Sequence, residues 1–163
     1  MQPIDPKLNE EVWSRVMAGQ AGGTGTAAAA ADTQEQRAAK MLELMQDERD
    51  DAATYRYLAR RVCGAEARAL QAISDEEACH YRKLGAMYFL LTGKCANLLP
   101  TQPECVSCQA DALRGRFQAE LNGSKAYEAV AQECTPMAQE FHALAADELR
   151  HSRIILSLLE CRL

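Results

Sequence analysis

Four long stretches of the chain repeat apolar residues every three or four positions, which is the spacing of one face of a helix. Gly64 and Gly93 end the first two stretches, because glycine breaks helical periodicity readily. Thr135 and Pro136 precede the last stretch, where they suit the N-cap and the first helical position. The predicted helices cover about residues 33–62, 66–92, 110–133 and 136–160. This pattern predicts an all-α fold, a four-helix bundle.

The segment before these helices follows a different pattern. Residues 8–17 are predicted to form a short amphipathic helix whose Trp13 docks on the bundle or, alternatively, on a partner. Residues 18–31 are rich in glycine and alanine and are predicted to be a flexible linker. Asp32, followed by Glu35 as in a capping box, is predicted to begin the bundle. The expected organisation is an N-terminal segment, residues 1–31, and a helical bundle, residues 32–163.

Composition supports helices and narrows the function classes. Alanine occupies 29 positions and Val, Ile and Thr together occupy 16, which favours helix over sheet. The net charge of −5 and the pI of about 5.3 give no reason to expect a nucleic-acid or anionic-membrane partner. We find no apolar run of membrane-span length and no signal peptide. Seven scattered cysteines do not resemble a disulfide framework, so we expect a cytoplasmic protein.

The inward faces of the predicted helices are apolar except in the middle. The polar residues there are Glu48, Tyr55, Glu77, His80, Glu120, Tyr127, Glu148 and His151. A shift of 72 residues carries the first Glu and Tyr, which lie seven positions apart, onto the second such pair. A shift of 71 residues carries the first Glu-x-x-His onto the second. The chain is therefore predicted to consist of two similar helical hairpins, residues 33–93 and 110–160.

Glutamate and histidine at positions i and i+3 lie on one helix face, close enough to hold an ion together. With Glu48 and Glu120 from the other two helices, four carboxylates and two imidazoles face one core. This is the donor set of a carboxylate-bridged dimetal site, and it suits iron or manganese better than zinc. A metal-free cluster satisfied by its own hydrogen bonds is the alternative. His142 lies off the inward face and is interpreted as a surface or packing histidine.

Four motifs resemble those of the rubrerythrin branch of the ferritin-like superfamily. They are Glu-Arg-Asp-Asp-Ala-Ala-Thr-Tyr (48–55), Asp-Glu-Glu-Ala-Cys-His (75–80), Glu-Leu-Asn-Gly-Ser-Lys-Ala-Tyr (120–127) and Asp-Glu-Leu-Arg-His (147–151). The resemblance covers about residues 33–160 and implies a ferritin-like bundle of two antiparallel hairpins with a long crossover between the second and third helices. The loop at 94–109, at about 3.3 Å per residue, is long enough to run the length of the bundle.

The resemblance also implies roles for the polar cluster. Glu48 and His80 would hold one iron ion, Glu120 and His151 the other, and Glu77 and Glu148 would bridge both. Tyr55 and Tyr127 would donate hydrogen bonds that orient the ligating carboxylates, with a role as plain core aromatics as the alternative. The implied cofactor is a pair of iron ions per chain, with manganese as the alternative.

Two features depart from the family. Rubrerythrins usually carry a further Glu one turn after the ligand of the third helix, where this chain has Gly123. They usually carry a C-terminal rubredoxin domain with two Cys-x-x-Cys motifs, whereas this chain has one such motif, Cys105 to Cys108. We therefore expect an external electron-donor protein such as rubredoxin.

The cysteines of the crossover are Cys95, Cys105 and Cys108. We interpret them as reduced residues that pack the crossover, with a redox pair or a small metal site as the alternative. The remaining cysteines are interpreted as small apolar residues of the helices, namely Cys63, Cys79, Cys134 and Cys161.

The expected function is a cytoplasmic oxidoreductase that reduces hydrogen peroxide or dioxygen, as in protection against oxidative stress. Peroxide is favoured because one dimetal site releases two electrons, which is what peroxide reduction requires. The first alternative is an iron-binding ferroxidase or storage protein, and the second is a metal-free helical interaction module. A monomer or homodimer fits the enzyme, whereas storage requires a large closed shell.

Overall fold

The computed structural model describes residues 27–101, 108–133 and 135–162. Over these residues it contains α-helices, one 3-10 turn and no strand, so the predicted all-α four-helix bundle is confirmed. The elements are α2 (Ala27–Ala59), α3 (Gly64–Thr92), α4 (Gln109–Glu133), η1 (Thr135–Met137) and α5 (Ala138–Glu160). The predicted helix at 8–17, its Trp13 and the linker before residue 27 lie outside the described residues.

The chain divides into two compact units at Gln36 and Arg37. Helix α2 begins at Ala27 in the first unit, so the prediction that residues 27–31 belong to a linker and that Asp32 starts the helix was wrong. The reason is that these residues are a run of five alanines, and alanine is the best helix former. The second unit, Arg37–Leu163, contains the remainder of α2 and all the later elements.

The other helix ends lie close to their predicted positions. Helix α2 ends at Ala59, three residues early, and α3 begins at Gly64 with a positive φ of 66°. Gly93 ends α3 in the left-handed conformation, φ 68°, and its N–H donates to the carbonyl of Phe89 at 2.8 Å. At the start of α5 the chain forms the 3-10 turn η1, so Met137 and not Thr135 is the N-cap residue.

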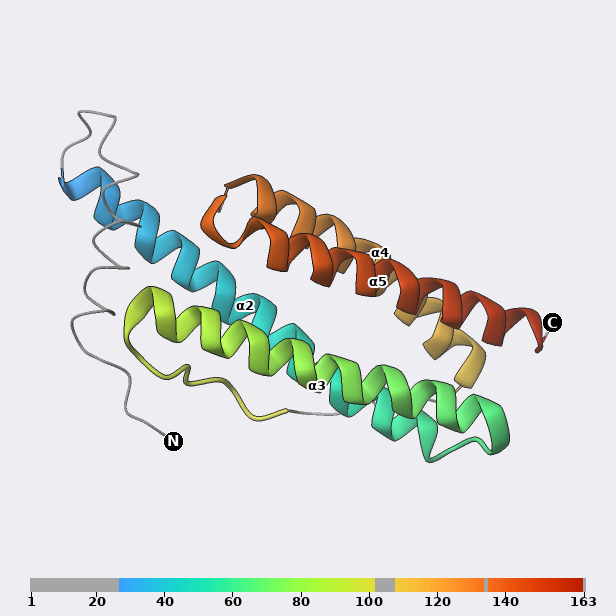
Figure 1. The fold of residues 1–163 in the computed structure, drawn as a ribbon. Helices are drawn as coiled ribbons and strands as arrows, with labels where there is room; N and C mark the ends of the chain where they lie inside the picture. Colours follow the sequence, from blue (N-terminus) through green and yellow to red (C-terminus); the bar gives the residue numbers. More distant parts are fainter. Residues whose placement is uncertain (1–26, 102–107, 134, 163) are drawn as a thin grey trace, which may run out of the picture. The chain divides into compact units, whose positions relative to one another are not determined.

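In the second unit the helices form two antiparallel hairpins, as Figure 1 shows by placing α3 beside α2 and α5 beside α4. Contacts also join the hairpins: α3 packs against α5, and Arg37 of α2 donates to the Glu133 carbonyl of α4. Within the first hairpin, the Ser74 hydroxyl donates to the carbonyl of Ala52 at 2.7 Å. Each helix therefore faces the core with one side.

The core consists of two apolar layers with a polar layer between them. One apolar layer contains Met41, Leu84, Phe141 and their neighbours, and the other contains Leu58, Ile73, Leu113, Ile155 and theirs. On each helix the predicted Glu or Glu-x-x-His falls between these layers. Glu48, for example, follows Met45 of the first layer, and Glu77 follows Ile73 of the second layer. The repeat seen in the sequence thus places one carboxylate-bearing turn per helix at the same level.

The crossover connects opposite ends of the bundle. Helix α3 ends beside the first apolar layer, whereas Gln109 at the start of α4 donates to the Leu58 carbonyl at the other end. The described part of the connection runs alongside the first hairpin (Figure 1) and is joined to it where the Leu99 N–H donates to Gln46 Oε1 at 3.0 Å. None of the described helices is both long and apolar enough to cross a membrane.

Candidate metal centre

The structure brings all six predicted ligand residues together at the centre of the bundle. Helix α2 contributes a Glu, α3 a Glu and a His, α4 a Glu, and α5 a Glu and a His. Each of the six is at most 5% exposed. These residues are Glu48, Glu77, His80, Glu120, Glu148 and His151. The inward spacing that the sequence shows therefore becomes a single buried cluster.

The cluster contains two groups of ligand atoms. Within each group the atoms lie within 4.8 Å of one another, which allows one ion to be held by all four residues. The first group is Glu48, Glu77, His80 and Glu148, and the second is Glu77, Glu120, Glu148 and His151. Glu77 and Glu148 belong to both groups, which is the arrangement of carboxylates that bridge two ions.

The two imidazoles present the same nitrogen to the centre. His80 Nδ1 lies 3.0 Å from a Glu77 oxygen and 3.3 Å from oxygens of Glu48 and Glu148. His151 Nδ1 lies 2.9 Å from Glu77 Oε1 and 3.5 Å from Glu120 Oε2. The rings are stacked with their centroids 5.8 Å apart. Both Nδ1 atoms therefore lie among carboxylate oxygens at hydrogen-bond or ion-pair distances, and each could turn to a shared cation.

Several buried ligand atoms lack a hydrogen bond among the described residues. They are Glu48 Oε2, Glu77 Oε1, Glu120 Oε2, Glu148 Oε1 and His151 Nδ1. Each of the four glutamates thus directs one oxygen into the cluster, where an imidazole Nδ1 atom lies 2.9–3.5 Å away but is not aligned for a hydrogen bond. A pair of cations would satisfy these atoms, so the residues present fit a dimetal group.

Without metal, the pKa values of the buried ligand residues are shifted far from their usual range. Burial raises the pKa of Glu48 to about 8 and that of Glu148 to about 10. Burial also raises the pKa of Glu77, but contacts with His151 and His80 outweigh it and lower the value to about 2. Burial lowers the His151 pKa, but hydrogen bonds to Glu120 and Glu77 raise it to about 11. Without metal, protons on these groups balance the carboxylate charge, and metal ions would replace those protons.

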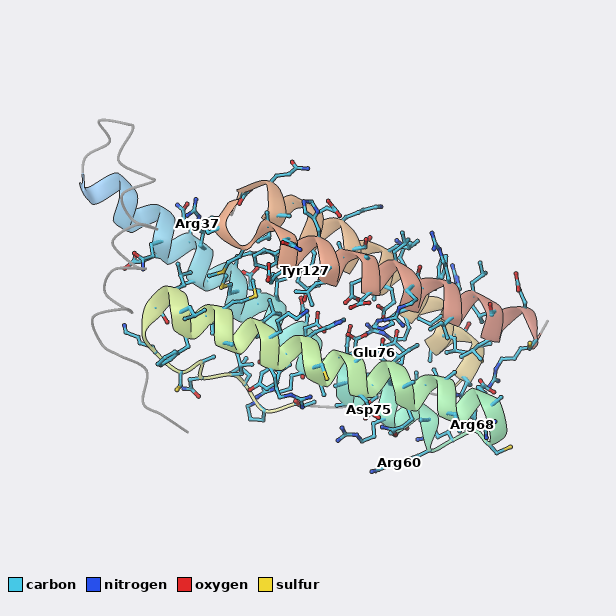
Figure 2. All side chains as sticks on the ribbon, in the orientation of Figure 1. Arg37, Arg60, Arg68, Asp75, Glu76 and Tyr127 are labelled. Atoms are coloured by element: carbon cyan, nitrogen blue, oxygen red, sulfur yellow. The ribbon has the colours of Figure 1, made fainter. Side chains whose placement is uncertain are left out.

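Two tyrosines tie the carboxylates of α2 and α4 to the opposite hairpin. The Tyr55 hydroxyl on α2 donates to Glu120 Oε1 on α4, and the Tyr127 hydroxyl on α4 donates to Glu48 Oε1 on α2. Tyr127 points from α4 into the space between the hairpins in Figure 2. Because each tyrosine uses one carboxylate oxygen, the other oxygen of Glu48 and Glu120 remains turned toward the centre. The structure thus places both tyrosines where the sequence expected donors to carboxylates.

Two acidic residues hold the outer nitrogens of the imidazoles. His80 Nε2 on α3 lies 3.3 Å from Asp147 on α5, and His151 Nε2 on α5 lies 2.6 Å from Glu76 on α3. Figure 2 shows Glu76 on the side of α3 that faces α5. Such contacts fix ring orientation and leave the other nitrogen free to bind an ion. Neither acid was predicted from the sequence, although an acidic residue directly precedes the Glu of each Glu-x-x-His motif.

An ion pair beside Tyr55 was also missed. Arg116 on α4 pairs with Asp51 on α2, and its Nε lies 3.5 Å from the Tyr55 hydroxyl. Its guanidinium also lies 3.7 Å from Glu120 Oε1. Burial raises the pKa of Asp51 to about 7, although Arg116 opposes this shift. Arg116 lies four positions before Glu120, a spacing that places both on one helix face.

Replacement of Tyr55 by phenylalanine should destabilise the protein. The change removes a buried donor to a carboxylate, and hydrogen bonds to charged groups contribute about 1.5–3 kcal/mol. We expect the free energy of unfolding to fall by that amount in urea denaturation. The control is Tyr57→Phe, because the Tyr57 ring lies beneath Arg61 and outside the cluster. A Tyr55→Phe effect below about 0.5 kcal/mol, the size of a neutral surface change, would contradict this role.

The remaining cysteines and histidine lie away from the cluster. His142 is exposed and pairs with Glu128 at 3.0 Å, as expected for a surface histidine. Cys63, Cys79 and Cys161 are exposed, and Cys63 and Cys161 flank helices instead of lying within them, so their interpretation as small apolar residues of the helices was wrong. Two of these lie at helix ends, where neighbouring helices do not cover them. Cys95 and Cys108 are also exposed, and Cys105 and Cys134 lie outside the described residues.

The crossover cysteines should be dispensable for metal binding. Cys95 and Cys108 are exposed and lie in neither group of ligands. We expect a variant with Cys95, Cys105 and Cys108 all replaced by serine to keep the metal content of the wild type. Elemental analysis of both proteins after identical loading checks this. Loss of iron from the triple variant would mean that the crossover contributes ligands.

Comparisons with protein-family models, with curated proteins and with solved structures found no match to this chain. The chemistry available to the cluster therefore follows from its own residues. Four buried carboxylates and two buried imidazoles, arranged in two overlapping groups, could hold metal ions.

Proposed function

We propose that this chain is a dimetal carboxylate protein of the rubrerythrin type, with two iron ions or, alternatively, two manganese ions. The proposed reaction is the reduction of hydrogen peroxide or dioxygen. One observation carries the proposal: the two four-residue groups share Glu77 and Glu148. Two separate single-ion sites would not require shared ligands, whereas bridging carboxylates place two ions close enough to act together.

The donor set supports this choice of metals. Each group offers three carboxylates and one imidazole, and none of the described cysteines belongs to either group. Hard oxygen ligands with one imidazole suit iron and manganese, whereas structural zinc sites favour thiolates and four-ligand closure. The four carboxylates also balance the charge of two divalent cations, so a loaded site would be electrically neutral in a low-dielectric core.

The proposed chemistry divides the work between the ions and the chain. A bound pair of redox-active ions would supply the two electrons that cleave the O–O bond of a peroxide. Tyr55 and Tyr127 hold Glu120 and Glu48 so that one oxygen of each faces inward. The same reaction consumes two protons, which would come from solvent, because the four glutamates would be ionised as metal ligands.

The proposal implies two partners. The oxidant is a small molecule, and the electrons that regenerate the reduced site come from an external donor protein such as rubredoxin. The cytoplasmic location and a monomeric or homodimeric state stay predictions from the sequence.

Anaerobic titration tests the proposal after elemental analysis has shown two iron ions per chain. We expect one equivalent of hydrogen peroxide per diferrous site to complete the oxidation, followed by the rise of ferric absorbance. The reaction should be faster than with dioxygen at equal concentration, because peroxide accepts the two electrons of one site. A site that dioxygen oxidises readily but peroxide does not would contradict the peroxidase and favour a ferroxidase. A chain that binds no metal would leave only a helical interaction module.

A further inference from the structure

A cavity of about 380 Å³ lies between α2 and α4 and reaches the metal cluster. Of the six cluster residues, Glu48 and Glu148 line it. The side chains of both are less than a tenth exposed. One oxygen of each lies 3.3 Å from His80 Nδ1. The cavity therefore ends on two buried carboxylates, and both belong to the first ligand group, which contains His80.

The internal repeat explains why there is space on this side. The shift of 72 residues that relates the hairpins maps Leu44 onto Arg116 and Asp51 onto Gly123. Arg116 and Asp51 form an ion pair beside Glu120, at the second ligand group, and line one part of the cavity. At the equivalent place beside the first group stand an apolar side chain and a residue with no side chain. The two halves therefore repeat their ligands but not their surroundings.

Gly123 is the residue that keeps the cavity open onto the ligands. A Cβ atom at this position would lie 3.4 Å from Glu148 Oε2, and any larger side chain would extend into the space over that carboxylate. Ala119 and Ala126 on the same helix also line the cavity and are small. With Leu44 from α2 they give it an apolar wall close to the ligands.

The size and lining of the cavity indicate an organic molecule. A water molecule takes up about 30 Å³ in the liquid, so 380 Å³ is far more than hydrogen peroxide needs. It falls within the range of pockets that bind small organic ligands, about 300–1,000 Å³. Asp47, Asp51 and Arg116 also line the cavity. Because Arg116 is paired with Asp51, the remaining acidic side chains leave an excess of negative charge that disfavours a carboxylated ligand. The lining fits a neutral molecule with a short apolar group.

We propose that this cavity binds an organic hydroperoxide, with its apolar group against Leu44, Ala119 and Ala126 and its peroxide group toward Glu48 and Glu148. This inference rests on the proposed dimetal function and names its substrate class. The O–O bond of ROOH would break with the uptake of two electrons and two protons, to give ROH and water. A bound diferrous pair would supply the two electrons.

The test compares two oxidants on the iron-loaded, reduced protein without oxygen. We expect tert-butyl hydroperoxide to oxidise the wild type with one equivalent per site. In Gly123→Leu the leucine should fill the cavity, so the rate with tert-butyl hydroperoxide should fall at least tenfold while that with hydrogen peroxide falls less than threefold. Ala119→Leu, which fills the same space from another position on α4, should act in the same direction. Both variants should keep two iron ions per chain.

Gly115→Leu is the matched control. Gly115 lies on the same helix, and a Cβ atom there would meet nothing within 4 Å, so this variant should behave as the wild type. A second readout avoids turnover: saturation-transfer NMR of tert-butanol with the zinc-loaded protein. The alcohol should bind the wild type and Gly115→Leu but not Gly123→Leu.

Two results would overturn the inference while the proposed function stands. The first is a wild type that hydrogen peroxide oxidises but tert-butyl hydroperoxide does not. The second is a pair of cavity-filling variants, iron-loaded as the wild type is, that slow both oxidants equally or neither. If neither oxidant reacts with the reduced wild type, the proposed function itself fails.

Discussion

Removal of the metal ions should lower the melting temperature of this protein by roughly 10–20 °C, because the ions bind the folded state and have no comparable site in the unfolded chain. Each ion held at a free concentration of about 100 times its Kd adds about 2.7 kcal/mol to the free energy of unfolding. For a chain of 163 residues, each kcal/mol shifts the melting temperature by about 2–4 °C. Circular dichroism before and after chelation measures the shift.

The control for this experiment is re-addition of iron to the chelated protein under anaerobic conditions, which should restore the original curve. The metal-free core must hold four glutamates within one cluster, where like charges and burial both oppose ionisation. An unchanged melting curve, measured on protein whose metal has been shown by elemental analysis to be absent, would count against a buried site.

Replacement of either cluster histidine by alanine should reduce the metal content from two ions per chain to one or none. Each ligand group contains one imidazole, so the substitution leaves an ion with three carboxylates and an excess of negative charge. Without the cation, those carboxylates would take up protons instead. We expect His80→Ala and His151→Ala to show this loss by elemental analysis after identical loading.

Two further variants should affect metal binding less than the loss of a ligand does. Asp147→Asn weakens the carboxylate contact to the outer nitrogen of His80 without removing a ligand, so it should lower metal affinity by about 10–100-fold. His142→Ala removes an exposed histidine that lies outside the cluster, and it should leave two ions bound. If both His80→Ala and His151→Ala still bind two ions per chain, the ligand assignment is wrong.

Much of the fold could be predicted from the sequence because helical periodicity and helix-ending residues are local signals. The three-residue spacing of Glu77 and His80 on α3 is enough to place both on one face. Its repetition 71 residues later shows that α5 must present the same face to the same core. The predicted start of α2 was wrong because the run of alanines was interpreted as a low-complexity linker. Alanine also has the highest helix propensity, and this propensity decides the structure here.

The surroundings of the cluster could not be predicted in the same way. Arg116 reaches Asp51 across 65 residues of chain, and such a pair depends on which helices become neighbours and at what level. The cavity depends on what is missing at Gly123, and a glycine within a helix gives no sign of what faces it. The acids that hold the histidines were predictable in principle, since Glu76 and Asp147 occupy the same place in the two motifs.

The contacts that orient the ligands all cross from one hairpin to the other. Tyr55 reaches Glu120, Tyr127 reaches Glu48, and each histidine is held by an acid on the opposite hairpin. Neither hairpin could therefore present a finished ligand set if it were separated from the other. Because the bound ions would have ligands on both hairpins, metal binding would oppose separation of the hairpins far more than fraying of any single helix. The metal-loaded protein should then unfold locally at its helix ends, while the contact between the two hairpins stays intact.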